Sequence, residues 1–414
     1  MTHHVRSLNR RDALSVAAGF VLGPWLARRL ESAALPTLKI TGFELIPVRA
    51  TPRTVWLFVR LRTDAGLTGL GEASDAFGFA NTTAANVATM RTQLATLFAF
   101  IDRGSPFDVE RFRQRGWTIA ASGLAGATAF SAIEQAMWDL AGKALDVPTY
   151  TLFGGKVRDT LPVYANINRA TSPRSPAGFA DAARRAVRDG FRSLKAAPWD
   201  GFPAAGSPAT EIEKATESGI AAAAAMREAV GAGVAIMLDC HSFFDVERAV
   251  RVAQRLEPYN LAWYEEPVAP ENVDDTLAIK RRIRQKMAGG EVLFGINGFA
   301  PLIERHAVDV IMPDVKHCGG LLELTRITAA AAARDVLVSP HNPSGPVSTA
   351  ASVQAAGGAA NVNLLELQYG EVPWRSELLA PPEQFIDGAI RVPDRPGLGV
   401  ELNEATVKAR GLRV

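Results

Sequence analysis

The segment AIMLDCH at residues 235–241 decides the fold, because an apolar, strand-like run ends there at an acidic residue, Asp239. The same arrangement returns in WYEEP, which carries Glu265, and in MAGGE, which ends on Glu291, so that 26 residues separate each acid from the next. That interval is the length of one strand plus one helix. Each acid is therefore expected at the same end of successive parallel strands.

The rhythm continues through Asp314 in VIMPDV and His341 in VLVSPHN, at intervals of 23 and 27 residues. Active sites of eight-stranded α/β barrels form at the carboxyl ends of the strands. Three clustered carboxylates repel one another unless a divalent cation lies among them. The spacing predicts a metal-dependent enzyme.

Eight apolar runs from Tyr164 onward have the lengths expected of strands. They are VYANIN, SLKAA, AIMLDCH, AWYEEP, MAGGE, VIMPDV, VLVSPH and NLLELQ. Helical runs such as FADAARRAVRDG and VERAVRVAQRL lie between them. Because eight strands close such a barrel, residues 159–370 are predicted to form a (β/α)8-type, modified TIM barrel of the α/β class.

The residues before the barrel have a different pattern. LKITGFELIPVR and VWLFVRLRTDAGLTGLGEA alternate as strands do, with a tight turn at 64–66. Helical segments are expected from about 83 to 101, 109 to 121 and 125 to 145. Residues 37–158 are thus predicted to form an α+β capping domain, and the proline-containing tail, 371–414, is predicted to pack on it.

Composition excludes several classes of function. An α/β barrel takes roughly 250 residues, so the chain of 414 has room for the additional domain. Lys+Arg number 45 against 43 Asp+Glu, with no basic stripe, which argues against nucleic acid as a partner. The two cysteines, Cys240 and Cys318, are too few for a disulfide framework. Cys240 should point away from the barrel axis, because it alternates with Asp239.

The first 36 residues resemble an export signal. Arg10 and Arg11 precede a weakly apolar run at 13–27, which is too short to span a bilayer, and Ser32-Ala33-Ala34 resembles a cleavage site. The pattern favours twin-arginine export to the periplasm, with no membrane association after signal removal. The alternative is a leader on a cytoplasmic protein.

From Leu38 to Val414 the motifs resemble the mandelate racemase/muconate lactonizing branch of the enolase superfamily. They are SAIEQAMWDLAGKALDVPTYTLFGGKVRD, WYEEP, GGE, PDVKHCGG and SPHNPSGPVSTAAS. The resemblance implies three Mg²⁺ ligands, which fall on Asp239, Glu265 and Glu291, and an Asp-His dyad, which falls on Asp314 and His341. It also implies a small hydroxy acid or sugar acid substrate and a homo-oligomer.

Glu266 follows Glu265 directly. Alternation along a strand sends neighbouring side chains to opposite faces, so only one of the two is expected to point inward. The family pattern selects Glu265.

The expected chemistry is removal of the proton next to a carboxylate. His341 is the predicted base, oriented by Asp314, as enolase-type sites pair a Lys or His base with magnesium. A buried structural histidine is the alternative. Lys195 is followed by Ala196 and Ala197 where many relatives have a Lys-x-Lys pair, so two-base racemisation is disfavoured. Lys195 is expected to neutralise a substrate carboxylate or enolate, with a solvated surface lysine as the alternative.

His241 follows Asp239 by two residues and is expected on the same face of the strand. The Asp-x-His pattern resembles the galactonate-dehydratase-like sugar acid dehydratases, in which this histidine protonates the departing 3-hydroxyl. It is also consistent with a strand cap or an epimerase base. Glu366 matches a glutamate that hydrogen-bonds the substrate carboxylate when protonated, which requires a raised pKa. Glu371 is the nearby rival.

Several weaker candidates are as consistent with ordinary loop positions as with substrate contact. They are Asn166, Asn168, Trp199, Asp200, Arg53 and Trp56. His317 lies near the dyad without a predicted role, and His306 is expected at a helix end on the surface.

The favoured function is a magnesium-dependent sugar acid dehydratase. The alternatives are a racemase, epimerase or cycloisomerase that uses the same enolate, and an exported sugar-acid-binding protein without turnover.

Overall fold

The computed structural model describes residues 35–79 and 82–412, and it divides into the units Met1–Thr37 and Leu38–Val414. The predicted export signal at residues 1–36 lies outside the described residues except for its last two. Among the described residues, no helix has the length and apolar character needed to cross a membrane.

The capping domain begins with an antiparallel sheet of three strands. Its members are β1 Ile40–Arg49, β2 Val55–Thr63 and β3 Thr68–Glu72, in the order β1-β2-β3. The turn predicted at 64–66 joins β2 to β3, and Gly66 supplies the positive φ of +80° that the turn requires. The short strand β4, Ala76–Phe79, follows.

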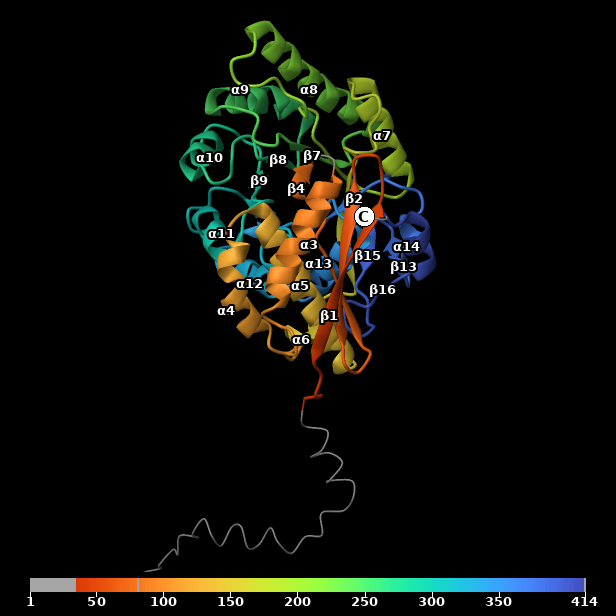
Figure 1. Ribbon diagram of the computed structural model, residues 1–414. Helices are drawn as coiled ribbons and strands as arrows, with labels where there is room; N and C mark the ends of the chain where they lie inside the picture. The colour runs from red at the N-terminus through yellow and green to blue at the C-terminus, as the bar shows by residue number, and fades with distance from the viewer. Residues whose placement is uncertain (1–34, 80–81, 413–414) are drawn as a thin grey trace, which may run out of the picture. The chain divides into compact units, whose positions relative to one another are not determined.

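Helices pack against this sheet, as Figure 1 shows in orange and yellow. They are α3 Ala84–Phe98, α4 Val109–Ala120, α5 Leu124–Ala144 and the short α6 Thr149–Leu152. The approach of α5 to β3 is close: a Cβ placed on Gly71 would lie 2.0 Å from the backbone oxygen of Ala132. Glycine in β3 therefore sets the distance between the helix and the sheet.

The barrel contains the eight predicted strands. They are β5 Thr160–Asn166, β6 Ser193–Ala196, β7 Ala235–Asp239, β8 Trp263–Glu265, β9 Met287–Gly289, β10 Val310–Ile311, β11 Leu337–Val338 and β12 Leu365–Gln368. Consecutive strands from β5 to β11 pair in parallel, and β12 pairs with β5. An isolated parallel bridge joins Val338 of β11 to Val362, just before β12.

Helices follow the strands on the outside of the barrel (Figure 1). They are α7 Pro176–Arg188, α8 Ala209–Val230, α9 Val246–Leu256, η2 Glu257–Tyr259, α10 Val273–Lys280, α11 Gly295–Glu304, α12 Gly320–Ala332 and α13 Pro346–Gly357. Side chains of alternate strand residues form two separate cores. Tyr164, Met237 and Trp263 fill the barrel interior, whereas Cys240 packs in the larger core that includes the helices, pointing away from the axis as predicted.

The tail contacts both parts of the molecule. Its elements are η3 Arg375–Glu377, β13 Leu379–Ala380, β14 Phe385–Ile386, β15 Ala389–Arg391, β16 Glu401–Leu402 and α14 Glu404–Arg410. An isolated antiparallel bridge joins Gly411 to Val48 of β1. However, β15 pairs antiparallel with β5, so the tail also extends the barrel sheet.

Candidate active site

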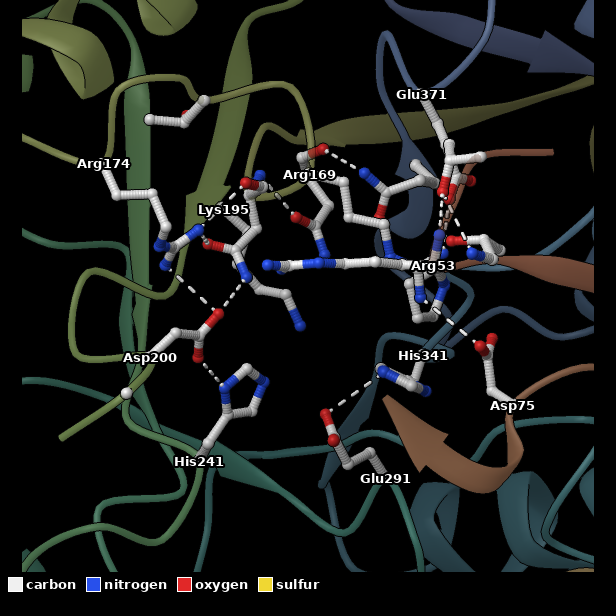
Figure 2. A pocket seen from close by; sticks show the side chains of 18 of the residues that line it. Arg53, Asp75, Arg169, Arg174, Lys195, Asp200, His241, Glu291, His341 and Glu371 are labelled. Carbon is white, nitrogen blue, oxygen red and sulfur yellow. Dashed lines mark hydrogen bonds and ion pairs between the residues drawn. The ribbon is translucent and has the colours of Figure 1, made fainter. Parts of the chain in front are cut away.

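A cavity of about 950 Å³ lies at the carboxyl ends of the barrel strands. The cap contributes the loop at 51–54 to its wall, and the barrel contributes strand-end residues that include Lys195, His241, Glu291 and His341. Figure 2 shows these side chains converging on one hollow. Residues separated by more than 200 positions in the sequence thus share one site.

Two residues of the cavity wall, His241 and Glu291, form a candidate metal site together with the buried Asp239. Asp239, His241 and Glu291 each offer one ligand atom, and these atoms lie within 4.8 Å of one another. Oε2 of Glu291 is buried and accepts no hydrogen bond within the described residues, although Nε2 of His341 lies 3.2 Å from it. Two of the three predicted carboxylate ligands, Asp239 and Glu291, are therefore brought together, and His241 lies beside them.

The side chain of Glu265, the third predicted ligand, faces the ammonium group of Lys195. Its Oε1 accepts a hydrogen bond of 2.6 Å from Nζ of Lys195, and its Oε2 accepts one of 2.7 Å from Nε1 of Trp263. Burial and the nearby charge of Asp239 raise its pKa well above the ordinary value. Glu265 thus lies beside the other carboxylates but is not part of the group of three.

The expectation that only one of Glu265 and Glu266 faces the site is wrong. Glu266 follows the end of β8 with a φ of +37°, so the strand alternation no longer applies to it. It lines the cavity, and its Oε1 accepts hydrogen bonds from the backbone nitrogens of Gly290, at 2.6 Å, and Glu291, at 3.3 Å. Burial, followed by the charge of Glu291, raises the pKa of Glu266 to about 8.

Lys195 is buried, which rules out the surface alternative; only 2% of its side chain is exposed. Its Nζ lies 2.6 Å from Glu265, 3.2 Å from Glu366 and 3.3 Å from Asp239. Burial alone would lower the pKa of Lys195, but these carboxylates raise it well above the ordinary value. The ammonium group is therefore charged and supplies positive charge within the carboxylate cluster.

The predicted dyad is assembled. Nδ1 of His341 lies 2.8 Å from Oδ2 of Asp314, and Nε2 lies 3.2 Å from Oε2 of Glu291. Lys316, which the sequence reasoning missed, donates to Asp314 from its backbone nitrogen at 2.7 Å and from Nζ at 2.9 Å. Burial opposes ionisation of Asp314, but Lys316 and the neighbouring histidines lower its pKa. An ionised Asp314 therefore orients the imidazole, and Nε2 of His341 is left facing the cavity.

A second aspartate–histidine pair lies across the hollow (Figure 2). Nδ1 of His241 lies 2.6 Å from Oδ1 of Asp200, and its Nε2 lies 3.2 Å from Oδ2 of Asp239. Asp200 is fixed in turn by Nδ2 of Asn168, at 2.6 Å, and by Arg174, at 3.2 Å. The weaker candidates Asp200 and Asn168 thus belong to the site.

The structure reverses the pKa expected for Glu366. Burial would raise it, but the charges of Lys195 and His341 and hydrogen bonds from Asn342 and Asn166 bring the pKa below the ordinary value. The Asn166 bond measures 2.6 Å. Glu366 is therefore an ionised carboxylate in the free site, and the sequence reasoning did not foresee the lysine beside it.

Glu371 has a different partner from Glu366. Arg169, another residue that the sequence reasoning missed, lies 2.9 Å from Glu371 and 3.5 Å from Asp75. All three line the cavity. Their position in loops far apart in the sequence left no local pattern that could have identified them.

The other weak candidates fall into different places. Trp56 and Trp199 are buried in the core and are absent from the cavity lining, whereas Arg53 is part of it. Nδ1 of His317 lies 2.9 Å from Oγ1 of Thr128 in α5, so this histidine links the barrel to the cap. His306 is exposed, as expected.

Comparison with known proteins decides the family. The family described as "Enolase C-terminal domain-like" matches residues 178–406, and the "Mandelate racemase / muconate lactonizing enzyme, N-terminal domain" matches residues 45–154. The chain belongs to the mandelate racemase/muconate lactonizing branch of the enolase superfamily. The resemblance and the fold class predicted from the sequence are therefore confirmed.

Curated relatives of this enolase superfamily member are named dehydratases, which are hydro-lyases. A D-galactonate dehydratase of Ralstonia pickettii is 31% identical over 90% of this chain and 94% of its own length. A D-xylonate dehydratase of Haloferax volcanii is 31% identical over 86% of this chain and 85% of its own length. A D-gluconate dehydratase of Thermoproteus tenax is 35% identical, but the match spans 68% of this chain and 56% of the relative.

Solved structures agree with the family. A mandelate racemase/muconate lactonizing enzyme from Jannaschia sp. CCS1 superposes with a TM-score of 0.79 at 28% identity, covering 91% of this chain and 98% of that one. One from Sulfitobacter sp. gives 0.79 at 27% identity, with 90% and 96% covered.

Proposed function

We propose that this protein is a magnesium-dependent sugar acid dehydratase that removes the proton on carbon 2 and eliminates the hydroxyl on carbon 3, giving a 2-keto-3-deoxy acid. The observation that carries the proposal is the presence of two aspartate–histidine pairs on one carboxylate-lined cavity, His341 with Asp314 and His241 with Asp200. Elimination of water needs both a base and an acid, each held in position. The names of the relatives support the same reaction class.

The residues fit a divalent cation. Asp239 and Glu291 present hard oxygen ligands within 4.8 Å of one another, and the buried Oε2 of Glu291 accepts no hydrogen bond from the described residues. Glu265 is adjacent and completes the set implied by the family, if its carboxylate turns from Lys195. When bound, Mg²⁺ supplies Lewis-acid stabilisation of the negative charge that develops on the substrate carboxylate.

His341 is the proposed base. Asp314 accepts the hydrogen bond from Nδ1, and Nε2 of the neutral imidazole takes the proton from carbon 2. Burial would lower the pKa of His341, but the carboxylates of Glu291, Glu366 and Asp314 raise it, which makes the imidazole a stronger base. The carbon–hydrogen electron pair becomes the carbon–carbon double bond of an enolate. The ionised Asp314 stabilises the imidazolium that forms, as the aspartate of a catalytic triad does.

His241 is the proposed acid. Oδ1 of Asp200 holds its Nδ1. The electron pair of the enolate forms the double bond between carbons 2 and 3 as the bond from carbon 3 to its hydroxyl breaks, and the proton on Nε2 goes to that hydroxyl, which leaves as water. The resulting enol takes a proton at carbon 3 as it tautomerises to the ketone. Burial would lower the pKa of His241, but Asp239 and Asp200 raise it, in accord with a protonated acid.

Lys195 and Glu366 are proposed to bind the substrate carboxylate region. Lys195 supplies a buried positive charge, and the ionised Glu366 holds that ammonium group at 3.2 Å. Ala197 stands where a second lysine would be required for two-base racemisation. This arrangement favours elimination over racemisation.

The test is to incubate the protein with Mg²⁺ and a set of sugar acids, with semicarbazide detection of 2-keto products. His341→Asn is expected to abolish both elimination and deuterium exchange at carbon 2, whereas His241→Asn should lose elimination and keep exchange. Full turnover by His341→Asn would refute the assignment of the base. Exchange without elimination in the wild-type protein would identify an isomerase, and the absence of both would indicate a binding protein.

We also propose export by the twin-arginine pathway and assembly as a homo-oligomer. The support is the pair Arg10-Arg11 ahead of a weakly apolar run, and the resemblance to the family. Fractionation of cells that express the full chain, with and without Arg10→Lys and Arg11→Lys, tests the first, and light scattering tests the second.

A further inference from the structure

Arg53 lines the active-site cavity without a partner. Within residues 35–79 and 82–412, its guanidinium group forms no hydrogen bond or ion pair; only its backbone nitrogen is bonded, to Oγ1 of Thr51 at 3.1 Å. An arginine presents five donors in a fixed fork that matches carboxylate and phosphate oxygens. The guanidinium group of Arg53 is therefore available to bind a carboxylate or phosphate.

Hydrogen bonds hold the loop that carries Arg53 in a fixed conformation. The backbone nitrogens of Ala50 and Thr51 donate to the oxygen of Thr54, at 3.0 and 3.1 Å, and the nitrogen of Thr54 donates to Oγ1 of Thr51 at 3.0 Å. These bonds close the chain between β1 and β2 into a compact turn. Arg53 is thus held at the cavity wall by the backbone rather than by contacts of its own side chain.

Every other arginine or lysine of the cavity is paired. Arg169 binds Glu371 and Asp75, and Lys195 lies among three carboxylates. Arg174 binds the carbonyl oxygen of Ala197 at 2.7 Å. Arg53 is therefore the one such cavity residue in the described part of the chain whose charge is not used within the protein.

The charge of Arg53 acts on the pKa of Arg174. Burial lowers the pKa of Arg174, Asp200 opposes that effect, and Arg53 adds to it. Asp200 is shared among Arg174, Asn168 and His241, so it does not neutralise both guanidinium groups. Two arginines that repel each other at the side of a cavity are stabilised when an anion lies between them.

Figure 2 shows both arginines facing the hollow that also contains His241, Glu291 and His341. The reacting end of a sugar acid belongs beside Lys195 and the metal ligands under the proposed function. With about 950 Å³ the cavity has space for a chain that reaches from there to Arg53. The arginine at the cap loop would then meet the opposite end of that chain.

We propose that the substrate carries a second anionic group on its far terminal carbon, a carboxylate or a phosphate, and that Arg53, assisted by Arg174, binds it. This inference rests on the proposed function, since it assigns the other carboxylate to the metal end. It makes Arg53 a specificity-determining residue that selects dianionic sugar acids over the monoanionic aldonates on which the named relatives act.

The test compares three six-carbon substrates of the same configuration: the aldonate, the aldarate and the 6-phosphoaldonate. The wild-type protein is expected to show a kcat/KM at least about 10-fold higher for one of the dianions than for the aldonate, the gain of a charge-assisted hydrogen bond. The aldarate and phosphate arms distinguish the two sources of the anion. An equal or greater kcat/KM for the aldonate overturns the proposal.

Variants locate the effect. Arg53→Gln should lower kcat/KM for the preferred dianion about 10- to 100-fold and that for the aldonate less than about 3-fold, whereas Arg53→Lys should retain part of the preference. Arg91→Gln, at an exposed position on α3, removes one cap charge away from the cavity and should change neither value. Equal loss for both substrates in Arg53→Gln would show a structural role and overturn the proposal.

Calorimetric binding separates this proposal from the proposed reaction. The His341→Asn protein should bind the dianion more tightly than the aldonate, and adding Arg53→Gln should remove the difference. If no acid is dehydrated by the wild-type protein but this binding preference persists, the proposed function fails and the anion site stands. If dehydration proceeds and Arg53→Gln leaves the binding preference unchanged, the anion site fails alone.

Discussion

Replacing Lys195 by Met tests the electrostatic arrangement of the whole site. The ammonium group is 2% exposed and lies 2.6, 3.2 and 3.3 Å from three buried carboxylates. At an effective dielectric constant of about 20, each contact at such a distance represents roughly 5 kcal/mol of attraction, which the loss of hydration on burial offsets in large part. Removing one member of a buried charged network costs about 3–5 kcal/mol, because the remaining charges are uncompensated.

Urea denaturation in EDTA measures this change, and Lys195→Met is expected to lower the free energy of unfolding by about 3–5 kcal/mol. Lys280→Met is the matched control: its Nζ contacts Asp309 at 3.0 Å with 25% of the side chain exposed, and the loss should be about 1 kcal/mol or less. Adding Glu366→Gln to Lys195→Met should recover part of the stability. A loss below about 1 kcal/mol for Lys195→Met would refute the view that this lysine compensates the cluster.

The remaining predictions address the second dyad, the cap and a buried carboxyl group. Asp200→Asn should lower the elimination rate about 10- to 100-fold while deuterium exchange at carbon 2 persists, because the change removes the acceptor that orients His241; equal loss of both reactions would contradict separate roles. Gly71→Ala should destabilise the protein by about 1–3 kcal/mol in urea, since its Cβ would lie 2.0 Å from the oxygen of Ala132, whereas Gly42→Ala, with open space, should change stability little. Burial raises the pKa of Glu134 to about 8, so the folded state keeps a proton that the unfolded state releases near its ordinary value; stability from this group is present below about pH 4.5 and is lost as the pH rises toward 8. The unfolding free energy of the wild-type protein should therefore fall more than that of Glu134→Gln between pH 5 and 8.5, and parallel curves would contradict the raised pKa.

The regular spacing of polar residues made most of the architecture predictable. Each of four polar residues stands at the end of an apolar run as long as a strand: Asp239, Glu291, Asp314 and His341. Because a strand–helix unit has an almost constant length, the spacing of these residues predicts that they lie at the same end of the barrel. The cap sheet was recognisable from its alternation and from the turn before Gly66. Spacing and alternation are local patterns, so one sequence is enough to recognise them.

Side-chain partners could not be read in the same way. Lys316 and Asp314 are two residues apart, yet nothing in their order shows that the lysine turns back onto the carboxylate. Asp200 is 41 residues from His241, and no periodic pattern connects them. Glu266 was assigned to the wrong face because alternation holds only while the backbone stays extended, and its positive φ lies just past the strand end.

The sequence by itself determined the barrel and the rim on which the polar residues lie, since both depend on the spacing of residues along the chain. Only the tertiary structure decided that Glu265 faces Lys195, that Glu366 is ionised and that the guanidinium group of Arg53 has no partner within residues 35–79 and 82–412. The physical reason is that a charge responds to whatever lies within a few ångströms of it and to how deeply it is buried. Both quantities arise only when distant segments of the chain pack together.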